Sequence, residues 1–190
     1  MKKEKISKMI ATTALVLAMF ALSIAFAAMS TTLNIHGTAK VQPASWQIRF
    51  ANLNEPTITG GASVLTAPTL TDTLIGTFSV RLTGPGDAIT YTFDIVNAGT
   101  INAVLGTLTD ATPTCTGTGA NAVADANIVC NNLNYTLVYT DTGISVAEGD
   151  TLNAGQIRNV TLRIAFLGTE LPENTVNITG LNKSLIYIQN

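Results

Sequence analysis

The chain has 190 residues, of which 46% are hydrophobic and 12% are charged, with a formal net charge of −2. This hydrophobic content excludes an intrinsically disordered chain, which has too little apolar surface to bury. Six basic and eleven acidic residues follow Ala28, and this sparse, mildly acidic balance argues against nucleic acid or anionic lipid as a partner.

The N-terminus has the pattern of a secretory signal. Lysines at positions 2, 3, 5 and 8 precede an apolar run over residues 9–28. The run closes with the small residues Ala25, Ala27 and Ala28, in the Ala-x-Ala form of a signal-peptidase site. We therefore expect residues 1–28 to be a signal peptide that a signal peptidase cuts near Ala27 or Ala28. Residues 29–190 then form one exported domain.

An uncleaved membrane anchor is the alternative interpretation of the same segment. Twenty residues at about 1.5 Å each span a hydrocarbon core of about 30 Å. On this interpretation only residues 9–28 meet the membrane, and the lysines keep the N-terminus on the cytoplasmic side. Both interpretations predict an extracellular or cell-surface location for the rest of the chain.

After Ala28, apolar and polar residues alternate with the period of two that is typical of half-buried strands. Clusters of Gly, Pro, Asn and Asp separate these stretches and predict turns. The pattern predicts an all-β fold, an antiparallel β-sandwich of jelly-roll or Ig-like type with about eight to ten strands and no helix after Ala28. In chain order, the alternation covers residues 33–40, 46–50, 78–83, 89–95, 103–109, 133–139, 160–166, 175–179 and 184–188.

The apolar side of these alternations predicts the core. Residues 60–73 alternate only faintly, so this stretch is predicted to be a long loop or an irregular edge strand. The expected core residues are Trp46, Ile48, Phe50, Val80, Ile89, Tyr91, Phe93, Ile95, Leu137, Leu162, Ile164 and Phe166.

Two cysteines, Cys115 and Cys130, lie in the part predicted to be exported. An even cysteine count in an oxidising setting favours a disulfide, and two free thiols are the rival interpretation. The bond would restrain residues 116–129, predicted to be a loop, and closing a loop of about 15 residues contributes roughly 3 kcal/mol in the chain-entropy model. The spacing of these cysteines from the single histidine does not make a zinc site.

No residues have the pattern of a catalytic site. His36, the only histidine, lies on the polar side of the first alternating stretch without an acidic or cysteine neighbour, so we interpret it as a solvated strand residue. Phosphate-loop, zinc-protease and serine-elbow motifs are absent from the sequence. We expect no enzyme activity, no metal site and no cofactor.

The first alternating stretch, residues 30–40, follows directly on the predicted cleavage site. A terminal strand can pair with its own sheet or with the exposed edge of a neighbour, because backbone donors and acceptors do not distinguish the two. If it joins a neighbour, Leu33, Ile35 and Ala39 are the anchoring side chains of a donated strand. A head-to-tail contact of this kind builds an open filament. Otherwise it is the first strand of its own sandwich.

One stretch with the character of a tight corner and a long strand reads Pro85-Gly86-Asp87-x-x-Thr90-Tyr91-x-Phe93-x-x-x-Asn97-x-Gly99. Together with the lysine-led signal, it resembles the TasA and camelysin group of secreted Gram-positive proteins. The resemblance implies a jelly-roll-like β-sandwich, subunits of a biofilm matrix fibre joined by a donated N-terminal strand, and a dedicated signal peptidase. The corner is also similar to Ig-like repeats of bacterial surface proteins. Met29 and the Cys115–Cys130 pair depart from the group, and the proteolysis ascribed to camelysin is not carried over.

Two functions are therefore expected as alternatives. The first is a self-associating structural subunit of a surface or matrix fibre. The second is a monomeric cell-surface adhesion module that recognises protein or glycan through residues 60–73 and 116–129. Neither of these stretches holds an aromatic residue, which counts against sugar stacking.

Overall fold

The structure is a computed structural model that describes residues 2–28, 37, 40–41 and 43–190. The chain separates into two compact units, residues 1–42 and residues 43–190, and each is described by itself.

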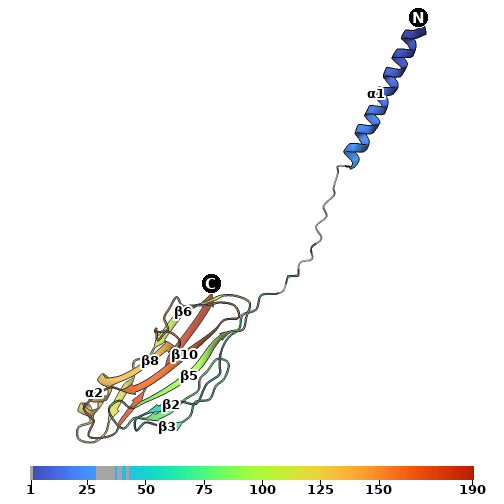
Figure 1. Cartoon of the computed structure of the whole chain (residues 1–190). Coiled ribbons are helices and arrows are strands. Elements are labelled where there is room, and N and C mark those ends of the chain that lie inside the picture. Colours follow the sequence, from blue (N-terminus) through green and yellow to red (C-terminus); the bar gives the residue numbers. More distant parts are fainter. Residues whose placement is uncertain (1, 29–36, 38–39, 42) are drawn as a thin grey trace. The chain divides into compact units, whose positions relative to one another are not determined.

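In the first unit, the lysine-led apolar segment is the helix α1 (Lys2–Ala28), which begins at the end marked N in Figure 1. Ala25, Ala27 and Ala28, the predicted cleavage residues, belong to its last turn. Within the described part of the chain, no helix combines the length and the apolar character that crossing a membrane requires.

The residues predicted to form the donated strand belong to the first unit, after α1 in the sequence. Leu33, Ile35 and Ala39 lie outside the described residues, as does His36. Their predicted roles therefore stay predictions.

Residues 43–190, which the structure describes without a gap, form twelve strands and one helix. All strand pairs are antiparallel, which confirms a predominantly β fold, with more and shorter strands than the eight to ten expected. The elements are β1 (Ile48–Ala51), β2 (Thr57–Thr59), β3 (Ser63–Thr66), β4 (Ser79–Arg81), β5 (Ala88–Asn97), β6 (Ala103–Asp110), β7 (Thr114–Gly117), α2 (Ala122–Asn132), β8 (Leu133–Tyr139), β9 (Thr151–Leu152), β10 (Ile157–Phe166), β11 (Val176–Thr179) and β12 (Lys183–Gln189).

The strands form one large sheet and three smaller ones. The large sheet has the order β1-β5-β10-β8, and β2 pairs with the start of β5 on the same edge as β1. Its long members β5, β10 and β8 run side by side in Figure 1. The second sheet has the order β12-β6-β9, and β3 with β4 and β7 with β11 form two-stranded pairs.

One hydrophobic core joins the large sheet to the β12-β6-β9 sheet. Alternate residues of β5 point into this core. Their four side chains are at most 3% exposed, namely those of Ile89, Tyr91, Phe93 and Ile95. Each fully buried side chain of this size contributes about 1.5–3 kcal/mol. The buried members from the long strands of the large sheet are Ile89, Tyr91, Phe93, Ile95, Leu137, Tyr139, Val160, Leu162 and Ile164, and those from the second sheet are Ala103, Leu105 and Leu152.

The prediction that Trp46 belongs to the core is wrong. Trp46 is 44% exposed. Trp46 precedes β1, whose pairing with β5 begins only at Ile48. The indole therefore lies outside the paired part of the sheet. Ile48 and Phe50, further along the same alternation, do pack against the core.

The prediction of a loop over residues 116–129, without a helix after Ala28, is also wrong. This stretch contains most of α2. Ala122, Ala124 and Ala126 are strong helix formers, and Asp125 and Val129, four residues apart, are the buried residues of one helix face. The sequence of small and polar residues hides this helix because its buried face has only one apolar side chain.

Residues 60–73 match the prediction of an irregular edge strand. They contain β3, whose pairing with β4 shifts register between Val64 and Thr66. An isolated bridge between Leu70 and Ile75 follows.

Candidate functional site

Residues 43–190 contain a groove of about 680 Å³, called here the interlayer groove. On one side it is lined by the inner face of the large sheet, with Phe50 of β1, Phe93 of β5 and Leu162 of β10. Residues 73–78 and 178–185 line the rest of it. The groove therefore reaches the core between the large sheet and the β12-β6-β9 sheet.

Aromatic rings make the groove apolar. The rings of Phe50 and Phe93 meet edge to face with centroids 5.5 Å apart. Phe78, from residues 73–78, tilts against the ring of Tyr91 at the same centroid distance. Apolar side chains that enter this space exchange water for ring and methyl contacts, which favours binding.

The strand β12 borders the groove. Lys183, Ser184 and Leu185 line the groove and begin this strand. Among the described residues, β12 pairs with β6 alone, so its other edge presents backbone N–H and C=O groups without a partner strand. An edge of this kind is a template for a further strand.

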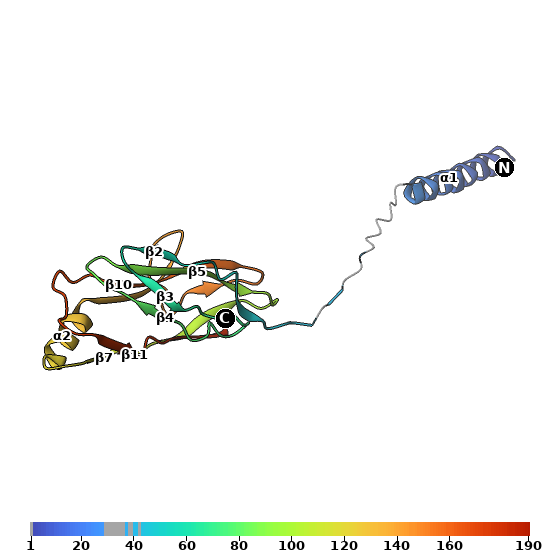
Figure 2. The ribbon, with the colours of Figure 1, turned by 90° about the horizontal axis from the view of Figure 1, so that it is seen from below.

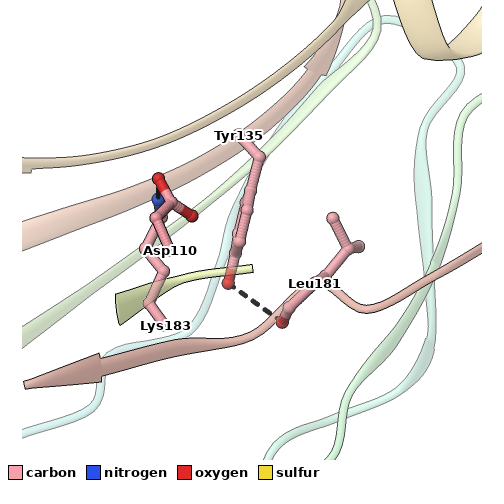
Figure 3. A network of polar contacts seen from close by, with 4 residues as sticks. All are labelled: Asp110, Tyr135, Leu181 and Lys183. Carbon is pink, nitrogen blue, oxygen red and sulfur yellow. Dashed lines mark hydrogen bonds and ion pairs between the residues drawn. The ribbon is translucent and has the colours of Figure 1, made fainter. Parts of the chain in front are cut away.

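A polar network, drawn in Figure 3, lies at the same place. The Tyr135 hydroxyl donates a hydrogen bond to the backbone carbonyl of Leu181 at 3.1 Å. The Nζ atom of Lys183 lies 2.5 Å from Oδ2 of Asp110, its register partner on β6, and 4.6 Å from the centroid of the Tyr135 ring. The network thus joins β8, β6, β12 and the segment before β12.

The members of this network differ in burial. The Lys183 side chain is 8% exposed and Asp110 is 53% exposed, so the ammonium group is largely withdrawn from water and depends on its carboxylate partner. Burial, together with the negative charge of Asp110, raises the pKa of Tyr135 to about 12. The phenol therefore remains a hydrogen-bond donor at neutral pH.

Of the Pro85–Gly99 stretch, Phe93 lines the groove, whereas the turn residues Gly86, Asp87, Asn97 and Gly99 lie outside its lining and hold turns. The carboxylate of Asp87, 4% exposed, accepts hydrogen bonds from the backbone N–H groups of Gly61, Thr83 and Gly84 and from the Thr83 hydroxyl. These bonds, led by that of the Thr83 backbone, outweigh burial and lower the pKa of Asp87. Gly86, with φ of 81°, supplies the left-handed turn.

Asn97, the second polar residue of the corner, is fully buried. Its Nδ2 atom donates to the carbonyls of Ile101 and Leu152, and its Oδ1 accepts from the N–H of Gly99. A Cβ at Gly99 would lie 2.5 Å from the carbonyl oxygen of Ser45, which explains the glycine. The corner is thus a structural device.

Cys115 and Cys130 form a disulfide that joins β7 to α2. The bond favours an oxidising environment for this chain. Within the described residues, no group of three or more His, Cys, Asp or Glu side chains is placed to hold a metal ion.

The interlayer groove has no clear signal in the sequence. Residues 73–78 lack strand alternation, and residues 178–182 join two short strands. Only the alternation of Lys183, Leu185 and Tyr187 in β12 indicates an inward face. Comparisons with models of protein families, with curated proteins and with solved structures found no match to this chain.

Proposed function

We propose that this protein is a structural subunit of an extracellular fibre, in which the N-terminal strand of one copy adds to the next copy. In this proposal the two layers form a β-sandwich of jelly-roll or Ig-like type. A signal peptidase removes the residues before Ala28 or Met29, which frees the N-terminal strand. The observation that carries the proposal is the apolar interlayer groove beside the open edge of β12.

A strand fits this combination of features better than a small molecule does. Its backbone pairs with the free edge of β12, and every second side chain points into the groove. Residues 33, 35, 37 and 39 alternate as Leu, Ile, Gly and Ala, so one face of the segment is apolar and small. These are the side chains that the proposal places in the groove of the neighbouring copy.

The contact is heterologous, since the N-terminal segment of one copy meets the groove of another. Repetition of such a contact gives an open filament instead of a closed ring when the rotation between copies does not close. Both partners are the same chain, so the proposal needs no cofactor and no second protein.

The test is the double variant Leu33→Asp/Ile35→Asp of the full chain, exported by its own N-terminal segment and examined by negative-stain electron microscopy after concentration. We expect filaments from the unchanged protein and only discrete particles from the variant. Two carboxylates cannot enter an apolar groove without a large desolvation cost. The circular dichroism spectrum of the variant stays that of the folded domain.

The matched control is Asn34→Asp/His36→Asp, which adds the same number of acids to the opposite face of the same segment. We expect it to keep forming filaments. Filaments from the Leu33/Ile35 variant would overturn the proposal. Discrete monomers from the unchanged protein would favour the monomeric adhesion module.

A further inference from the structure

One wall of the interlayer groove belongs to a peripheral part of the fold. Ile178, Thr179 and Leu181 line the groove, and the first two are the last residues of β11. Among the described residues, β11 pairs with β7 and with no strand of the two core sheets. A two-stranded pair is marginally stable by itself. The Tyr135 hydroxyl holds Leu181 at one end of the wall, so it is the β11 part that needs another support.

The support comes from α2. Figure 2 shows α2, β7 and β11 gathered at one end of the domain. The Asp125 carboxylate of α2 is 1% exposed and accepts hydrogen bonds from the backbone N–H groups of Glu173 and Asn174, at 2.9 and 3.0 Å, and from Asn174 Nδ2 at 3.1 Å. Those two residues lead into β11, so α2 holds the start of the groove wall.

The helix itself is short and buries few side chains. It has eleven residues, it begins after Asn121 without a side-chain cap hydrogen bond, and its buried residues are Asp125 and Val129. A helix of this length is marginal in water without tertiary contacts. The Cys115–Cys130 disulfide is the covalent link that joins it to β7.

The disulfide is also attached to the strand that pairs with the groove wall. Cys115 is the register partner of Ile178 in the β7–β11 pair. Further along, the backbone N–H and the hydroxyl of Thr118 both donate to the carbonyl of Thr175, at 3.2 and 3.0 Å. The disulfide thus links α2 covalently to β7, and the hydrogen bonds between β7 and β11 connect β7 to the wall.

We propose that the Cys115–Cys130 disulfide is a redox-sensitive brace, which keeps residues 176–182 in position as the wall of the interlayer groove. A dithiol reductant opens it: the disulfide takes up two electrons and two protons to become two thiols, and the dithiol is oxidised to its own disulfide. The core sheets remain folded, and the groove loses its wall. The consequence for assembly rests on the proposed function, whereas the brace itself does not.

The test is amide hydrogen exchange, followed by mass spectrometry, on the full chain in three forms: oxidised, treated with dithiothreitol, and as the variant Cys115→Ala/Cys130→Ala. We expect exchange in residues 173–182 to be at least about tenfold faster without the bond, because local opening controls these amides. Exchange in β5 and β10 stays unchanged. Dithiothreitol has no further effect on the double-alanine variant, which controls for the reagent.

Three results would overturn the brace. The first is unchanged exchange in residues 173–182 without the disulfide, and the second is faster exchange confined to residues 114–132. The third is loss of protection in β5 and β10 as well, because the bond would then hold the whole domain.

Electron microscopy of the same three samples separates the brace from the proposed function. Faster amide exchange in the wall together with undiminished filaments would support the brace and contradict assembly through the groove. Unchanged exchange, together with loss of filaments in Leu33→Asp/Ile35→Asp, keeps the fibre proposal and overturns the brace.

Discussion

Three buried polar side chains, those of Asp87, Asn97 and Asp125, hold loops and turns of this domain through hydrogen bonds. Asp87 accepts four of them, Asn97 makes three, and Asp125 accepts three. Burial pushes the pKa of Asp125 upward, but the bonds from Glu173 and Asn174 outweigh it, so the pKa lies below its ordinary value. Such groups are costly only when they lose their partners.

The variant Asp87→Asn tests how much the hydrogen bonds of one buried carboxylate contribute to stability. The amide nitrogen must face an N–H or hydroxyl donor whichever way the side chain turns, so we expect the Tm to fall by about 5 °C or more. The pKa of Asp87 is lowered, so its contribution is complete above the ordinary value of about 3.9 and disappears as pH falls through the folded-state pKa. The difference in Tm between the two proteins therefore shrinks below about pH 4.

Thermal unfolding followed by circular dichroism between pH 7 and pH 3 measures this difference. Asp141→Asn, at an exposed turn position, is the control and leaves the Tm almost unchanged. A pH-independent difference for Asp87→Asn would contradict the assignment to the carboxylate.

At the scale of elements, the two edges of a strand behave differently. The inner edge of β12 pairs with β6 along seven register positions, with a shift between Ile186 and Tyr187. The other edge has no partner strand among the described residues, and Lys183, Ser184 and Leu185 at the start of the strand line the groove. An exposed strand edge invites addition of another strand, and the groove determines which side chains the added strand can have.

Ser184→Trp tests whether the groove receives a strand. Ser184 lies among the groove-lining residues at the start of β12, and its side chain is on the exposed face, opposite Lys183 and Leu185. A large side chain there obstructs an added strand without removing a core contact. We expect the fraction of protein pelleted as filaments to fall at least about tenfold, while the Tm changes by only a few degrees.

The matched control is Thr109→Trp. Thr109 is the register partner of Ser184 on β6, is also exposed, and does not line the groove. It should pellet as the unchanged protein does. Equal loss for both variants would mean that bulk anywhere on this face, and not the groove, impedes assembly.

At the scale of the whole molecule, the chain combines a lysine-led apolar helix with a β domain that has its own hydrophobic core. The disulfide favours an oxidising environment, which agrees with the export that the N-terminal pattern predicts. Removal of the helix would leave residues 29–42 as a free N-terminal segment ahead of the domain, which is what strand addition between copies requires.

Mass spectrometry of the exported protein tests this processing. We expect the mature chain to begin at Ala28 or Met29 when the full sequence is secreted by a Gram-positive host. The triple variant Ala25→Leu/Ala27→Leu/Ala28→Leu should keep its N-terminal segment, because the peptidase requires small residues there. An unchanged protein that retains residue 1 after export would contradict cleavage.

Local periodicity in the sequence determined the long strands, since a period of two specifies which face of β5, β8 and β10 is buried. The cysteine pairing followed from cysteine count and compartment. Two features needed the tertiary structure. The helix α2 buries a carboxylate, and its partners near residue 173 are 48 and 49 positions away. The interlayer groove exists because residues 73–78 and 178–185 meet the same sheet face, and contacts at such separation leave no pattern in the local sequence.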